Sequence, residues 1–230
     1  MNSIRIPAPL VIALIALLAA AGMAAQASSI PTLSPEQREI LGHMSIVQLD
    51  DGLGGQCKTI RITGVNVQIV NGLGATNGYP TSPSSFDGNL TEVNGLGNLI
   101  IGYNESNAGS NRTGSHNLVV GRNNDYTAFA GIVAGTDNKV LAPASSVVGG
   151  YHNEATALHS AILGGEDNAT AGERAAIGGG VSNRANALRS WIGGGQGNNA
   201  NASTASIVGG AGVTITEPFL TGVGALYLKP

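Results

Sequence analysis

Short apolar segments followed by glycine recur through the second half of the chain, at a spacing of mostly fifteen residues. Typical copies are AILGGEDN and WIGGGQGN, and the copies begin at residues 98, 117, 131, 146, 161, 176, 191 and 206. A period of this length has room for two short strands and two tight corners, but not for two packed helices. The pattern therefore predicts an all-β fold, a parallel β-solenoid whose equivalent strands stack about 4.8 Å apart.

Three columns of the repeat keep their residue type. Glycine and asparagine tolerate a positive φ, so we expect their columns to form corners. The aliphatic column that precedes glycine is expected to lie on a strand with its side chains inside. The corner columns are Gly121, Gly135, Gly150, Gly165, Gly180, Gly195 and Gly210, with Asn124, Asn138, Asn153, Asn168, Asn183 and Asn198. The aliphatic column is Leu118, Ile132, Val147, Ile162, Ile177, Ile192 and Ile207.

The residue after each inward aliphatic side chain should point outward, because side chains alternate along a strand. This column is apolar or glycine and never polar, and an aliphatic wall that faces water is a sticky surface. We expect it to be buried in a homotrimer or other homo-oligomer. If the two faces are swapped, the stripe moves but the second face stays apolar. The predicted outward stripe is Val119, Val133, Val148, Leu163 and Val208.

The first residues of the chain have the pattern of a secretory signal peptide. Residues 1–27 contain Arg5, an apolar run and the small residues of Ala25-Gln26-Ala27. Cleavage there predicts an extracellular or cell-surface protein with no transmembrane segment in the mature chain, and an uncleaved anchor is the alternative. The chain has 11 Lys and Arg against 14 Asp and Glu, so losing Arg5 leaves a net charge of −4. This charge gives no reason to expect nucleic-acid binding.

Residues 28–97 are expected to cap the first turn of the solenoid. Ser34 and Gln37 form a capping-box pattern at the start of a predicted helix over 34–43. Strands are predicted over 45–49 and 58–72, the second with a bulge at Gly64. Residues 214–230 are expected to form a tail or a second cap.

The composition agrees with a thin core. The chain has 35 glycines but only three Phe, five Tyr and one Trp, so small side chains must fill its interior. Cys57 is the only cysteine, which excludes an internal disulfide. We expect a buried or unreactive thiol, and an intermolecular disulfide is the alternative.

The turns ASSVVGGYHNEATAL and RAAIGGGVSNRANAL resemble the head repeats of trimeric autotransporter adhesins, the YadA-like head. The resemblance covers residues 98–213 and implies a left-handed β-roll, a homotrimer and adhesion to a host or matrix surface. The period of fifteen is longer than is usual in that family. The coiled-coil stalk and membrane-anchor barrel of the family have no counterpart in the sequence, so we expect a head-like roll without them.

The triple glycines at 178–180 and 193–195 raise the question of a nucleotide site. No Gly-Lys-Ser/Thr follows them, and they recur in register without a helix, so they are interpreted as structural. Hexapeptide-repeat acyltransferases have a different period and need a catalytic histidine. His116, His152 and His159 lack a supporting acid–base or metal constellation and are interpreted as surface residues. We predict no catalytic, cofactor-binding or metal-binding residues.

One outward column is basic. His159, Arg174 and Arg189 share it, and Arg184 lies on a neighbouring column. Stacked turns would make these residues a positive ladder for an anionic ligand, with a solvated face as the alternative. We therefore predict an exported, non-enzymatic, adhesin-head-like protein, or alternatively a structural component of an extracellular layer or appendage. An enzyme would need a site within residues 73–97.

Overall fold

The computed structural model describes residues 33–224, so the predicted signal peptide and residues 225–230 lie outside the described part. The chain divides into two compact units, and the boundary lies between Val67 and Gln68. This boundary falls inside residues 28–97, for which the sequence predicts a single cap.

The first unit contains a helix and a hairpin. Helix α2 (Pro35–Gly42) begins with the predicted capping box, in which Ser34 and Gln37 each accept a hydrogen bond from the other's backbone N–H. Strands β1 (Met44–Asp50) and β2 (Gln56–Ile62) pair in antiparallel fashion. The carboxylate of Asp51 accepts N–H groups of Leu53 and Gly55 in the turn, and these bonds lower the pKa of Asp51 below its usual value.

The predicted strand over 58–72 is wrong in its second half. β2 ends at Ile62, and Gly64 follows it with a φ of +78°. The physical reason is the length of the partner strand. β1 begins at Met44, which pairs with Ile62, because helix α2 occupies the residues before Met44. The residues after Ile62 therefore have no partner strand in β1. Cys57 lies on β2 with its thiol exposed, so the expectation of a buried thiol is also wrong.

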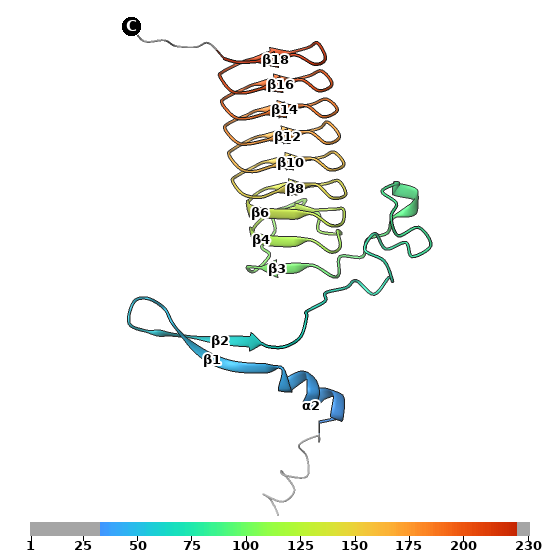
Figure 1. The fold of residues 1–230 in the computed structure, drawn as a ribbon, viewed down its shortest axis with the longest axis vertical. Helices are drawn as coiled ribbons and strands as arrows, with labels where there is room; N and C mark the ends of the chain where they lie inside the picture. Colours follow the sequence, from blue (N-terminus) through green and yellow to red (C-terminus); the bar gives the residue numbers. More distant parts are fainter. Residues whose placement is uncertain (1–32, 225–230) are drawn as a thin grey trace, which may run out of the picture. The chain divides into compact units, whose positions relative to one another are not determined.

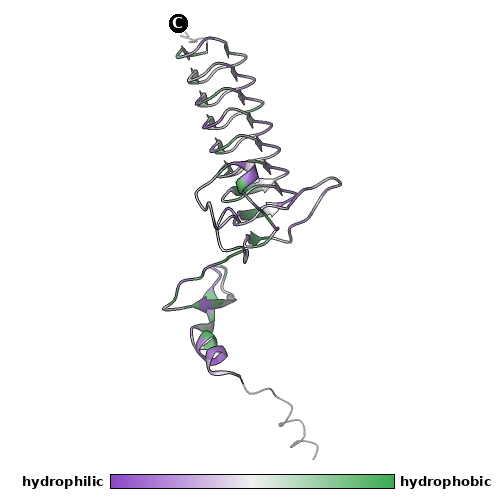
Figure 2. Cartoon of the chain, turned by 90° about the vertical axis from the view of Figure 1, so that its right-hand side faces the viewer, coloured by the Kyte–Doolittle hydropathy of each residue, from purple (hydrophilic) through white to green (hydrophobic). Residues whose placement is uncertain are grey.

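The second unit is the predicted parallel β-solenoid, whose turns stack along one axis (Figure 1). A turn has about fifteen residues, since Ala161 pairs with Ala176, and Ala176 with Trp191. One sheet has nine strands: β3 (Leu99–Ile101), β4 (Leu118–Arg122), β6 (Ile132–Thr136), β8 (Ser146–Val147), β10 (Ala161–Ile162), β12 (Ala176–Ile177), β14 (Trp191–Ile192), β16 (Ser206–Ile207) and β18 (Thr221–Gly222). The other has seven: β5 (Asp125–Tyr126), β7 (Lys139–Val140), β9 (Glu154–Ala155), β11 (Ala169–Thr170), β13 (Arg184–Ala185), β15 (Asn199–Ala200) and β17 (Thr214–Ile215). The turns stay in register along the stack (Figure 2).

The core is a column of aliphatic side chains with small residues opposite. Val147, Ile162, Ile177, Ile192 and Ile207 are fully buried, as predicted. The opposite strands contribute Ala155, Thr170, Ala185 and Ala200, which leaves no room for aromatic rings in these turns.

The inward column is wrong by one residue in the two turns that precede Val147. Val119 and Val133 are 1% and 0% exposed, so they belong to the core and not to the outward stripe. Ile132, predicted to be inside, is 38% exposed, and Leu118 is only partly buried. In these two turns a single glycine stands where the later turns have Gly-Gly. Counting three residues back from the conserved glycine therefore reaches Leu118 and Ile132, each one residue before the side chain that points inward. Strand pairing sets Val133 opposite Val147 instead.

The glycine corners are confirmed. Gly165 and Gly180 have φ values of +89° and +88°, and the other glycines of the column also lie in the left-handed region. The asparagine column is not a positive-φ corner. The residue before each asparagine takes that conformation, as His152 and Asp167 do at +58° and +55°.

The asparagine side chains point inward and form a buried ladder. The backbone N–H of Asn168 donates to Oδ1 of Asn153 at 3.0 Å, and Asn183 donates to Oδ1 of Asn168 at the same distance. Nδ2 of Asn168 donates to the carbonyl of Gly180 at 2.9 Å. Asparagine is therefore required for internal hydrogen bonding and not for its backbone freedom.

The solenoid extends beyond residues 98–213 of the sequence interpretation. β17 and β18 continue the two sheets into the segment expected to be a tail. At the other end, residues 68–97 contact the first turns and contain η1 (Gly88–Leu90). The ring of Phe86 stacks on that of Phe129, with centroids 5.8 Å apart.

Candidate functional site

The predicted basic column exists but is weaker than its sequence indicates. His159, Arg174 and Arg189 all have φ values near +58°, and their N–H groups donate to the preceding turn. Arg174 forms an ion pair with Glu173 at 2.7 Å, and the His159 ring packs edge-on against Phe86 at 4.8 Å. Arg184 lies on β13, in another column. The structure therefore does not gather these four residues into one site.

A cleft of about 370 Å³ lies on the outer surface of the first turns, beneath residues 107–110. Nδ2 of Asn107 donates to the Asp137 carboxylate at 2.7 Å, which holds these residues against the solenoid. Tyr151 contributes a ring that is 49% exposed. The polar side chains and the ring that line the cleft are those of Asn107, Ser110, Asn123, Asp125, Asp137, Lys139, Tyr151 and His152.

A second cleft of about 280 Å³ continues from the first and shares His152 with it. Its charged and polar lining includes Glu154, Asp167, Ser182 and Arg184. We call the two clefts together the outer groove. Sequence analysis missed this site because its residues come from successive turns and form no local motif. The only available signal was the contrast between constant inward columns and changing outward ones.

The outer groove contains His, Asp and Ser side chains, which raises the question of a catalytic triad. Nδ1 of His152 lies 2.5 Å from Oδ1 of Asp167. In a triad the histidine stands between the serine and the acid. Here His152, Asp167 and Ser182 follow one another in a single column, so the acid stands between the other two. This order does not place a base beside the serine hydroxyl.

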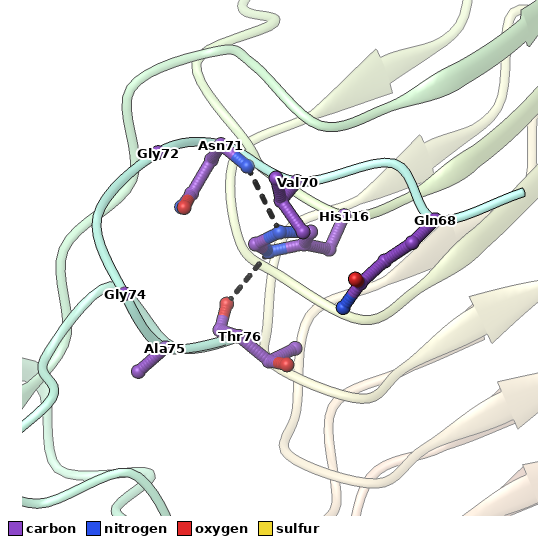
Figure 3. Close-up of a pocket in the computed structure, with 8 residues that line it drawn as sticks. All are labelled: Gln68, Val70, Asn71, Gly72, Gly74, Ala75, Thr76 and His116. Carbon is purple, nitrogen blue, oxygen red and sulfur yellow. Dashed lines mark hydrogen bonds between the residues drawn. The ribbon is translucent and has the colours of Figure 1, made fainter. Parts of the chain in front are cut away.

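A further pocket of about 440 Å³ surrounds His116 (Figure 3). Nε2 of His116 accepts the N–H of Asn71 at 3.2 Å, and Nδ1 lies 2.9 Å from the Thr76 carbonyl oxygen, so Nδ1 carries the proton. His116 therefore fastens residues 71–76 to the solenoid and is not a free surface residue. Nδ2 of Asn71 is buried without a hydrogen-bond partner, and it is not accessible enough to meet a ligand.

The outer side of the nine-stranded sheet carries an apolar stripe that is interrupted at Gly178 and Gly193. Val148, Leu163 and Val208 are 49%, 62% and 52% exposed, as predicted for the outward stripe. Trp191, which precedes the inward Ile192, adds a half-exposed ring to this side. We call Val148, Leu163, Trp191 and Val208 the apolar face.

Comparisons with protein-family models, with curated proteins and with solved structures found no significant match to the chain. Within residues 33–224, no helix has the length and apolar character needed to cross a membrane. In the same range, no three His, Cys, Asp or Glu side chains are grouped as a metal site would require.

Proposed function

We propose that the chain is an exported, non-enzymatic adhesin-head-like protein whose outer surface binds a host or matrix surface. The observation that carries this proposal is the contrast between the inside and the outside of the turns. The inward Ile and Asn columns barely change, whereas the outward column changes at every turn, through Asp137, His152, Asp167 and Ser182. A constant framework with a varied surface is the usual arrangement of a repeat protein that recognises a partner.

Self-association is the second part of the proposal. The apolar face presents three exposed aliphatic side chains, after β8, β10 and β16, and the half-exposed ring of Trp191 on β14, whereas the turn of β12 contributes only Gly178. Exposed apolar surface of this kind is typical of protein–protein contacts. We propose that copies of the chain, three by resemblance to the YadA-like head, bury this face against one another.

The alternative is a structural component of an extracellular layer or appendage without a specific ligand. The apolar face favours it too, because such a component also assembles from copies. The two functions differ in what the varied outer surface does. An adhesin binds a surface saturably, whereas a scaffold assembles without one.

Adhesion is tested with the purified, fluorescently labelled chain on wells coated with matrix proteins and on cultured cells. We expect saturable binding that unlabelled chain displaces and that heat-unfolded chain does not reproduce. Non-saturable binding on every surface, together with ordered assemblies in solution, would favour the scaffold.

The basic column is tested in the same assay with Arg174→Glu and Arg189→Glu combined. If the column contacts an anionic surface, the charge reversal lowers binding several-fold and removes its salt dependence. Lys58→Glu and Arg61→Glu combined is the control, because it makes the same charge change on the hairpin. Equal binding by both double variants would exclude the basic column from the contact.

A further inference from the structure

The outer groove is elongated along the solenoid axis. Five residues with a positive φ, one from each of five successive turns, line it and are separated by four steps from turn to turn: Asn123, Asp137, His152, Asp167 and Ser182. At about 4.8 Å per step the groove is about 19 Å long. A groove of this length fits an extended chain molecule better than a single small ligand.

The charge of the groove excludes polyanions. Four carboxylates line it, those of Asp125, Asp137, Glu154 and Asp167, against the cations of Lys139 and Arg184. The excess of negative charge repels nucleic acids and sulfated glycans. The ligand is therefore neutral or cationic.

Tyr151 supplies the one large apolar surface in the groove. Its ring is 49% exposed and lies 5.7 Å from the His152 ring, at an interplanar angle of 31°. An exposed ring beside hydrogen-bonding groups suits a ligand with a flat apolar side and a polar rim. A pyranose ring has this form, with C–H groups on one side and hydroxyls around the edge.

The polar lining matches hydroxyl groups. A hydroxyl both donates and accepts, so it can pair with a carboxylate, an ammonium or an amide. Asp137, Lys139 and Asn107 provide all three types close to Tyr151. Neither cleft is lined by Leu, Ile, Val or Met, so the groove offers no apolar pockets for the side chains of a peptide.

We propose that the outer groove binds a neutral oligosaccharide, with one sugar ring stacked on Tyr151 and its hydroxyls bonded to Asp137, Lys139 and Asn107. This inference rests on the proposed adhesive function and names a ligand class for it. The neutral sugar chain, and not an anionic surface at the basic column, is then the adhesive target.

The experiment applies the full chain to an array of neutral, sialylated and sulfated oligosaccharides, and then measures the affinity of the best neutral ligand by calorimetry. Tyr151→Ala is expected to weaken binding at least about tenfold, which corresponds to about 1.4 kcal/mol. Tyr151→Phe keeps the ring and is expected to retain most of the affinity. The control is Tyr103→Ala, since Tyr103 is 95% exposed and lies outside both clefts.

The outcomes separate this inference from the function on which it rests. Binding of neutral glycans that is lost in Tyr151→Ala but kept in Tyr103→Ala, with unchanged melting of both, supports the groove. The proposal is overturned if the chain binds no neutral glycan on the array, if it prefers sulfated glycans, or if it binds only basic peptides. Saturable surface adhesion without glycan binding overturns the groove alone, and glycan binding without surface adhesion overturns the adhesive function alone.

Discussion

At the scale of single residues, the asparagine ladder replaces backbone hydrogen bonds that the tight corners cannot make. Asn168 is 1% exposed, its Oδ1 accepts the N–H of Asn183, and its Nδ2 donates to the carbonyls of Gly164 and Gly180. A buried polar group stabilises a fold only when it is paired, and here all the pairs are made. Sequence alone identified the column but not its role, because asparagine also favours left-handed corners.

Replacing Asn168 by Leu should therefore destabilise the solenoid strongly. The change leaves the N–H of Asn183 without its partner inside the protein and removes one of the two hydrogen bonds that the Gly180 carbonyl accepts, at a cost of about 3 kcal/mol. Asn186→Leu is the matched control, because Asn186 is exposed and its side chain bonds only to Asn201. Urea unfolding followed by circular dichroism gives the two free energies. Equal values for both variants would contradict the role assigned to the ladder.

At the scale of elements, one extra glycine per turn changes the strands. β4 and β6 have five residues each, whereas the later strands of the same sheet have two residues each. In those later turns a second glycine precedes the corner glycine. The repeat predicted the stacking because its columns specify it. It could not predict which of two adjacent apolar residues faces inward at Val133, since that depends on pairing with Val147.

The two glycines of a pair should respond differently to a methyl group. At Gly165, where φ is +89°, a Cβ would collide with the carbonyl oxygen of Gly180 in the next turn. At Gly164 a Cβ would meet nothing within 4 Å. Gly165→Ala is thus expected to lose at least about 2 kcal/mol, and Gly164→Ala to lose less than about 0.5 kcal/mol.

Thermal melting of the two alanine variants, compared at equal protein concentration, measures this difference. The two substitutions add the same methyl group at neighbouring positions. The change in composition and in helix or strand propensity is therefore the same in both variants and does not contribute to the difference between them. If Gly164→Ala melts as low as Gly165→Ala, the corner geometry is not what requires glycine at position 165.

At the scale of the whole molecule, the repeat made the solenoid predictable from the sequence. The outer groove and the division of the chain at residue 67 could not be predicted in this way. The groove forms because an insertion before the second turn carries Asn107 to Asp137, thirty positions later in the sequence. Such a contact depends on how turns stack and leaves no pattern in either segment. The sequence predicts a single cap over residues 28–97. It does not show that β1 and β2 pair with each other, which keeps the hairpin's contacts within the first unit.

Because Val133 lies in the core and Leu163 on the apolar face, the same substitution is expected to affect assembly differently at the two positions. Leu163→Asp places a charge on the apolar face, where the side chain is 62% exposed, so it should break self-association without unfolding the chain. Val133→Asp places the same charge in the core, where Val133 is fully buried, and should unfold the solenoid. If Val133 were on the outward stripe, the two variants would behave alike.

Light scattering and circular dichroism distinguish these outcomes. We expect a trimer for the unaltered chain, a folded monomer for Leu163→Asp, and lost β structure for Val133→Asp. Ala171→Asp is the control, because it adds an exposed charge to the same turn just after β11, on the other sheet, and should leave the trimer intact. A monomeric unaltered chain at micromolar concentration would contradict self-association through the apolar face, because an exposed aliphatic stripe of this kind would then be stable in water without a partner.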